Sequence, residues 1–217
     1  MALTPSRACV LRLCATRRPP EASPRRAFAR KLRGFDSRRL HWYERPGDAS
    51  APHPPPPAGR PVAWRAVSFV PGDFEPPREL VLPQLHLVPL GAEHNKSDHA
   101  AWTSSIAHIR ATPGFESTGW PPVEGMSLDA NRADLEAHAR DFAERTGFTF
   151  TVLRPGTEEV IGCLYIYPAT DGEHDAQVRS WVRADVAELD APLHAAVLGW
   201  LSERWPFERV SYADRAA

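Results

Sequence analysis

Histidine and serine side chains are the first residues of this chain whose types could do chemistry. His94, His99 and His108 are five and nine residues apart, and neither spacing places two ligands together on one helical face. We therefore expect no metal site. Ser104 and Ser105 lack the strand–turn–helix sequence that exposes a nucleophilic serine, so nucleophilic catalysis is not indicated either.

The number of cysteines indicates the cellular compartment of the protein. Cys9, Cys14 and Cys163 are too few for a disulfide framework, and free thiols are typical of a reducing cytosol, so we predict a cytoplasmic protein. Cys163 lies within the apolar run VIGCLYIY, which favours a core position. The chain contains no run of about 18 apolar residues, so we expect no membrane-spanning segment.

Charge divides the 217-residue chain into two segments. Residues 1–66 hold 14 Lys and Arg against 4 Asp and Glu, whereas residues 67–217 hold 12 against 23. The first segment is also rich in proline and poor in large aliphatic residues. We predict a disordered leader over residues 1–66 and one folded domain over residues 67–217, because the leader has little apolar surface to offset chain entropy.

Three hypotheses exist for the leader. Its arginines are typical of an arm that neutralises nucleic-acid phosphates, but the acidity of the folded segment argues against a nucleic-acid partner. An arginine-rich, acid-poor start also resembles an organelle transit peptide. The simplest hypothesis is a solvated segment without a fold, read from a start codon placed too far upstream.

Hydrophobic periodicity and turn residues predict eight elements in the folded segment. A lead-in segment with Phe69, Phe74 and Leu80 precedes them. Asn95 and Ser127 are the expected N-caps of the first two helices, and Gly147 is the expected stop of the second. The predicted elements are strand Gln84–Leu90, helices Lys96–Arg110 and Leu128–Arg145, strands Phe148–Leu153, Val160–Tyr167 and Ala176–Val182, helix Ala191–Arg204 and strand Arg209–Tyr212.

The connections between these elements predict an α/β fold with a mixed sheet. Short turns join the three middle strands, which favours an antiparallel meander. The last strand follows a helix, so the unit from Ala176 to Tyr212 is expected to be a right-handed βαβ crossover with two parallel strands. Ligands of α/β sheets tend to lie where the strand order switches in this way.

The sequences of Thr151–Pro168, Ala176–Asp190 and Trp200–Ala213, in this order of elements, resemble the GNAT superfamily of acyl-CoA-dependent N-acetyltransferases. The resemblance covers about Gln84 to Ala213. It implies a GNAT-like mixed sheet in which the last two strands diverge, and acetyl-CoA as the cofactor in the opening between them.

The resemblance also implies which residues would bind the cofactor. Main-chain N–H groups of Val182 and Arg183 would face the pantetheine and the thioester carbonyl. Tyr212 would be the catalytic acid that protonates the leaving thiolate; the alternative is a tyrosine packed at the strand end. The full set of expected cofactor contacts is Trp181, Val182, Arg183, Leu189 and Ala191.

Two features depart from the family pattern. The family's diphosphate loop is rich in glycine, whereas Arg183–Pro192 contains none and carries Glu188 and Asp190. Asp190 is expected to cap the following helix, and its carboxylate would then occupy the N–H groups that a diphosphate needs. The family also usually continues with another helix and two more strands, and the sequence holds no segment of that length after Tyr212.

The first two helices line the acceptor pocket in the family. This implies that a small-molecule amine acceptor would contact Trp102, Ser105, His108 and Trp120. The alternative is that Ser105 and His108 lie on the solvent side of an amphipathic helix.

Two functions therefore remain open. One is an N-acetyltransferase-like enzyme that transfers an acetyl group from acetyl-CoA to an amine of a small molecule or protein. The other is a non-catalytic GNAT-like module that binds a small molecule or forms a homodimer through an exposed sheet edge.

Overall fold

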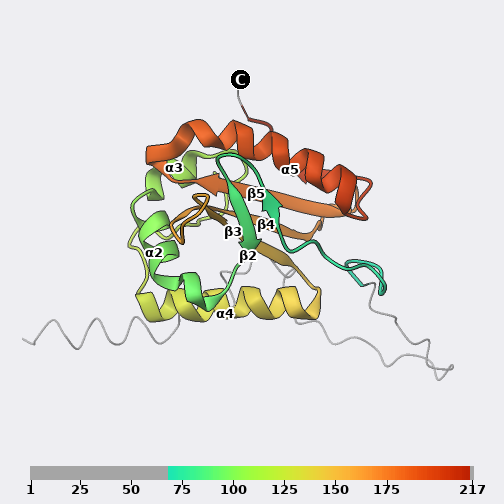
Figure 1. Ribbon diagram of the computed structural model, residues 1–217, viewed down its shortest axis with the longest axis horizontal. Coiled ribbons are helices and arrows are strands. Elements are labelled where there is room, and N and C mark those ends of the chain that lie inside the picture. Colours follow the sequence, from blue (N-terminus) through green and yellow to red (C-terminus); the bar gives the residue numbers. More distant parts are fainter. Residues whose placement is uncertain (1–67, 216–217) are drawn as a thin grey trace, which may run out of the picture. The chain divides into compact units, whose positions relative to one another are not determined.

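A six-stranded sheet forms the centre of the chain in the computed structural model, which describes residues 68–215 (Figure 1). The hypotheses on residues 1–66 lie outside the described residues. The strands lie side by side in chain order. The elements are β1 (Leu80–Val81), β2 (His86–Pro89), η3 (Ala92–His94), α2 (Asn95–Thr103), α3 (Ile106–Ala111), α4 (Leu128–Glu144), β3 (Phe148–Leu153), β4 (Val160–Pro168), β5 (Ala176–Val182), η4 (Ala184–Leu189), α5 (Asp190–Arg204) and β6 (Val210–Tyr212).

The predicted α/β class and strand directions are confirmed. Strands β1 to β5 pair antiparallel with their neighbours, and β5 pairs with β6 in parallel. Strand β4 is central, and its residues from Val160 to Ile166 are buried, as its continuous apolar sequence predicts. Strands β3 and β5 have the predicted bounds.

Two hydrophobic clusters cover the two faces of the sheet. On one face, Phe150 and Leu164 pack with Leu193 and Val197 of α5. The other cluster includes Trp181 of β5 together with residues of α2, α3 and α4. Figure 1 shows α5 and α4 on opposite sides of the sheet.

The prediction of a single helix over Lys96–Arg110 was wrong, because the helix breaks at Ser104 and Ser105. Thr103 Oγ1 donates a hydrogen bond to the His99 carbonyl, and Ser104 Oγ donates to the Ala101 carbonyl. Such hydroxyls compete with the helical backbone pattern. Ser105 has non-helical backbone angles (φ −129°, ψ 16°), and α3 begins after it.

Three smaller expectations were also wrong. Asn95 is the first helical residue rather than a cap, because its side chain is buried and donates to the Leu128 carbonyl. Helix α4 ends at Glu144, and the left-handed residue that stops it is the C-cap Arg145 (φ 63°) rather than Gly147. The segment expected to lead into the domain contains the short strand β1. The Ser127 cap is confirmed, since its side chain accepts from the Ala130 N–H at 3.1 Å.

Two searches of residues 68–215 gave negative results. No helix there combines the length and the apolar character that crossing a bilayer would require. No group of three or more His, Cys, Asp or Glu side chains in this range has an arrangement that could hold a metal ion.

Candidate functional site

Pairing between β5 and β6 covers only the start of β5. The three paired positions run from Ala176 opposite Val210 to Val178 opposite Tyr212. Strand β5 continues to Val182, whereas β6 ends at Tyr212. We call the region bordered by Ser180, Asp190 and Tyr212 the β5–β6 wedge, and it lies where the resemblance places a cofactor.

The side chain of Arg215 fills this wedge. Its Nε donates to Asp190 Oδ2 at 2.5 Å, and its Nη2 donates to the carbonyl (2.9 Å) and the hydroxyl (3.2 Å) of Ser180. Nη1 donates to the carbonyls of Ala213 (2.8 Å) and Pro113 (3.4 Å). Only 5% of the side chain is exposed, so this guanidinium is a buried cation with partners on every nitrogen.

Tyr212 borders the wedge with its ring and its hydroxyl. The hydroxyl makes a hydrogen bond with Ser180 Oγ, and the guanidinium carbon of Arg215 lies 5.4 Å from the ring centroid. On α5, the ring of His194 lies 4.2 Å from the Tyr212 ring. Burial raises the pKa of Tyr212 to about 12, so this phenol stays protonated at neutral pH. Burial and the charge of Arg215 lower the pKa of His194.

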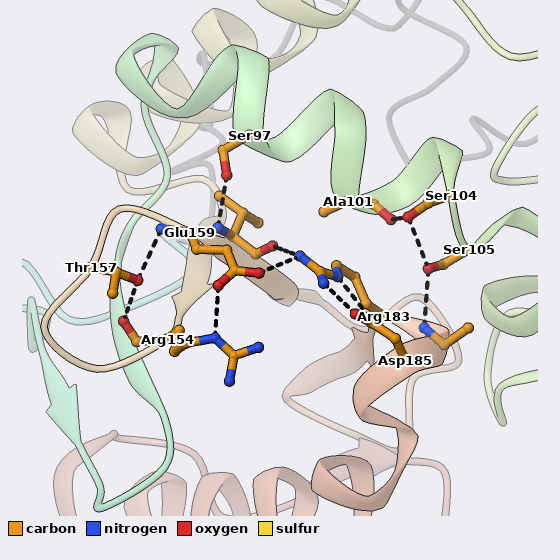
Figure 2. A network of polar contacts seen from close by, with 11 residues as sticks. Ser97, Ala101, Ser104, Ser105, Arg154, Thr157, Glu159, Arg183 and Asp185 are labelled. Atoms are coloured by element: carbon orange, nitrogen blue, oxygen red, sulfur yellow. Dashed lines mark hydrogen bonds and ion pairs between the residues drawn. The ribbon is translucent and has the colours of Figure 1, made fainter.

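The loop that corresponds to the family's diphosphate cradle is folded back on itself as η4. The Ala184 N–H donates to Ser105 Oγ at 3.0 Å. Figure 2 labels Ser105, which also lies next to Ser104 at the α2–α3 break. The N–H of Arg183 donates to the Ile161 carbonyl at 2.8 Å, and the N–H of Val186 donates to the Arg183 carbonyl at 3.1 Å. These three donors therefore have partners within the protein.

The cation of this loop is neutralised as well. The Arg183 guanidinium binds Asp185 and also Glu159 Oε1, at 2.7 Å, while Glu159 Oε2 accepts from Arg154 at 2.7 Å (Figure 2). Hydrogen bonds from the two arginines lower the pKa of Glu159, and the bond from Arg183 lowers the pKa of Asp185. The loop thus presents paired charges.

Acyl-CoA does not fit these residues in the way that the family binds it. A diphosphate at this position would need free N–H donors, but those of Arg183, Ala184 and Val186 are used internally. Because adjacent amides of a strand point to opposite edges, the Val182 N–H points toward the wedge, which Arg215 occupies. The expectation that Arg183 offers its N–H to a cofactor is corrected, since Ile161 already accepts that hydrogen bond.

The expected helix cap of α5 also differs from the structure. Asp190 is the first residue of α5 and not its cap, because its backbone angles are helical (φ −65°, ψ −49°), and its carboxylate binds Arg215. Among the described residues, the other oxygen, Oδ1, is buried without a hydrogen-bond partner. Of the remaining expected cofactor contacts, Leu189 is buried in the cluster beneath α5 and Ala191 is exposed.

The structure gathers three of the expected site tryptophans into one aromatic cluster. Trp120 lies 6.2 Å from Trp102 and 6.0 Å from Trp181, measured between ring centroids. All three are buried. They pack as core residues between the sheet and α2, whereas their roles toward a ligand remain predictions.

The two other residues expected to contact the acceptor are Ser105 and His108, and they differ in their surroundings. Ser105 is buried and bonds Ala184, so the alternative that it faces solvent is wrong. His108 is half-buried, and within the described residues its Nε2 is a buried atom without a hydrogen-bond partner.

Sequence reasoning missed a buried polar network between α2 and α4. Asn131 Nδ2 donates to Asp98 Oδ2 and to Asn95 Oδ1, each at 2.9 Å, and Trp102 Nε1 donates to Asn131 Oδ1 at 2.8 Å. Burial raises the pKa of Asp98 to about 6. A signal was present, because Asn131 and Leu135 are four residues apart and share one helical face.

A second missed cluster lies further along α4. His138 Nδ1 is 2.7 Å from Tyr167 Oη and 3.1 Å from Thr149 Oγ1, and Tyr167 donates to Asp141 Oδ2 at 3.0 Å. Burial raises the pKa of Tyr167 well above its usual range. These bonds fix α4 against β3 and β4.

Comparisons with known proteins place the fold. No protein-family model matches the sequence, and no curated protein matches it. Among solved structures, one similar chain is described as a ribosomal-protein-serine acetyltransferase of Vibrio cholerae, with a TM-score of 0.50 and 14% identity over 64% of this chain and 75% of that one. Another is the ribosomal-protein-S5-alanine acetyltransferase of Vibrio fischeri, with a TM-score of 0.50 and 10% identity over 63% and 73% of the two chains. The chain has the GNAT fold.

Proposed function

We propose that this chain is a non-catalytic GNAT-fold module that binds a small molecule and does not carry out acetyl-CoA-dependent transfer. One observation carries the proposal: the buried guanidinium of Arg215 lies in the β5–β6 wedge and bonds Ser180 and Asp190. A thioester carrier would have to displace this cation and lose its ion pair.

The neighbouring loop supports the same conclusion. An anion-binding loop stabilises negative charge through free N–H groups and an unpaired cation. Here Ser105 takes the Ala184 N–H, and two carboxylates neutralise Arg183. Glu188 adds a further carboxylate on the exposed surface of η4. The local charges therefore oppose a diphosphate.

The test is a thermal-shift titration of the full chain with acetyl-CoA, together with an assay of free thiol release in the presence of a panel of amines. A ligand of the native state raises the melting temperature, and at a concentration of about 100 Kd it contributes about 2.7 kcal/mol. We expect no shift at about 1 mM acetyl-CoA and no release of thiol above the buffer rate. A saturable shift with thiol release would refute the proposal.

An N-acetyltransferase is the second candidate, and Tyr212 favours it. Its phenol lies at the position where pairing between β5 and β6 stops, and its pKa of about 12 keeps the proton that a catalytic acid must give. If this candidate is right, Tyr212→Phe abolishes thiol release while the thermal shift by acetyl-CoA persists. If the module is right, neither protein releases thiol.

A dimer through the free edge of β6 remains a part of the module hypothesis. Among the described residues, β6 is the last strand of the sheet and pairs only with β5. Sedimentation of the full chain distinguishes a monomer from a dimer, and it does so independently of the ligand.

A further inference from the structure

We propose that the β5–β6 wedge is a binding site for a guanidinium cation, and that Arg215 is its occupant within the same chain. The inference rests on the proposed function, because it names the class of small molecule that the module would bind. In this fold the opening would receive an anionic cofactor, so the proposal assigns the opposite charge preference to it.

The groups around the wedge are those that a guanidinium needs. Asp190 supplies a carboxylate, and Ser180, Ala213 and Pro113 supply three carbonyl oxygens, all within 3.4 Å of an arginine nitrogen. No other cation in the described part of the chain forms an ion pair with Asp190. A diphosphate would be repelled by the same oxygens.

The arrangement also selects the shape of the cation. A guanidinium has five N–H donors in a rigid plane, and the oxygens of the wedge accept hydrogen bonds from Nε, Nη1 and Nη2 from different directions. The Tyr212 ring lies near the guanidinium carbon, at 5.4 Å from the ring centroid. A compact ammonium has three donors and would leave some of these buried oxygens without partners.

A further acceptor remains open beside the cation. Asp190 Oδ1 is buried without a hydrogen-bond partner in the described residues, because Arg215 engages the carboxylate through its other oxygen alone. A small guanidinium compound is not tethered to a backbone and can turn to bond both oxygens of the carboxylate. The site therefore accommodates a free ligand at least as well as the arginine side chain that fills it.

Since Arg215 fills the site, a soluble ligand must compete with it. The apparent affinity of the wild-type protein for the ligand is the intrinsic affinity multiplied by the fraction of molecules in which Arg215 has left the wedge. Replacing Arg215 by Ala removes the competitor and leaves the half-buried carboxylate of Asp190 without its counter-ion. Removal of one partner of a buried ion pair is strongly destabilising, so we expect the melting temperature of Arg215→Ala to fall by at least about 6 °C.

The experiment is a chemical rescue of the full-chain Arg215→Ala variant. Methylguanidinium at about 20 mM should raise the melting temperature of this variant by about 3 °C, and that of the wild type by less. Methylammonium at the same concentration should give no more than the wild-type shift. The double variant Asp190→Asn/Arg215→Ala should lose the rescue. Equal shifts in the wild type, the single variant and the double variant would overturn the proposal.

Arg209→Ala is the matched control. Arg209 is also paired with a carboxylate, Asp175 at 3.6 Å, but 62% of its side chain is exposed. This variant should lose little stability and gain nothing specific from methylguanidinium, because exposed ion pairs contribute little to stability.

A second measurement covers the case in which Arg215→Ala does not fold. In the wild-type protein, the Nε proton of Arg215 should exchange with solvent at least about tenfold more slowly than that of Arg209, since Asp190 and burial protect it. Equal exchange of the two protons would contradict the buried site. The two proposals can fail separately. Acetyl-CoA binding to the wild type would refute the proposed function, whereas the rescue by methylguanidinium tests only the guanidinium site.

Discussion

The clearest single perturbation of this fold is Asp98→Asn in the network between α2 and α4. The carboxyl of Asp98 is buried and accepts a hydrogen bond from Asn131. Burial is the main cause that raises its pKa from 3.8 to about 6; the hydrogen bond from Asn131 opposes it, and the nearby charge of Asp134 adds to it. The folded state therefore binds this proton more tightly than the unfolded chain does.

The direction of the pH effect follows from that difference. Stability contributed by the protonated carboxyl is present below the unfolded pKa of 3.8 and is lost as the pH rises through about 6. The difference between a pKa of 3.8 in the unfolded chain and about 6 in the folded protein corresponds to about 3 kcal/mol of unfolding free energy. The neutral amide that Asp98→Asn introduces carries no such cost, and its oxygen can still accept from Asn131.

We therefore expect Asp98→Asn to stabilise the protein at neutral pH and to lose that advantage in acid. The free energy of unfolding in urea, variant minus wild type, should fall by about 2 kcal/mol between about pH 7 and about pH 4. Glu124→Gln, which changes an exposed carboxylate, is the control and should show no such slope. A difference that is independent of pH, or one that grows in acid, would refute the burial argument.

Three further predictions test other parts of the structure. Ser105→Ala should cost about 1–3 kcal/mol of unfolding free energy in urea, because it leaves the Ala184 N–H without its partner. The control is Ser104→Ala, at an exposed residue whose hydroxyl bonds only within its own turn and to Ser105, and it should cost less than about 0.5 kcal/mol. Equal costs of the two variants would contradict the role of Ser105. Gly147→Ala should cost about 2 kcal/mol or more in the same assay, because a Cβ at this position would lie 2.1 Å from the Tyr167 ring. The control is Gly199→Ala in α5, where a Cβ meets nothing within 4 Å, and it should stabilise the protein by about 0.5–1 kcal/mol. If Gly147→Ala does not change the stability, the Tyr167 ring moves freely. The double variant Glu188→Gly/Asp190→Gly should bind inorganic pyrophosphate at least about tenfold more tightly than the wild type in calorimetry, because two carboxylates are removed and Arg215 loses its counter-ion. Unchanged binding would show that this loop does not correspond to the diphosphate-binding loop of the fold.

Much of the fold follows from local sequence patterns. Strand β4 is apolar at successive positions, so its place at the centre of the sheet could be predicted. The parallel pairing of β5 and β6 follows from the helix that connects them. The break between α2 and α3 could not be read in the same way, because Ile106 and Ile109 continue the apolar face of the preceding helix while a hydroxyl at Ser105 is needed by a loop 79 residues away.

The candidate site was harder to predict for the same reason. The lack of glycine in the loop was visible in the sequence, and the structure shows its physical counterpart in the bonded N–H of Ala184. The contact between Arg215 and Asp190 joins residues 25 positions apart that neither periodicity nor a motif relates. Asp190 therefore occupies a position in the sequence that is typical of a helix N-cap, whereas in the folded protein its carboxylate is the counter-ion of Arg215.

The proposed function depends on what occupies the β5–β6 wedge. The most direct measurement is a crystal structure of the full chain grown with about 5 mM acetyl-CoA, a concentration at which a ligand with a Kd of about 1 mM or below fills most of its sites. We expect density for the Arg215 guanidinium between Ser180 and Asp190, with hydrogen bonds to both, and no cofactor at that position. Density for a pantetheine chain along β5, with Arg215 displaced from Asp190, would contradict it.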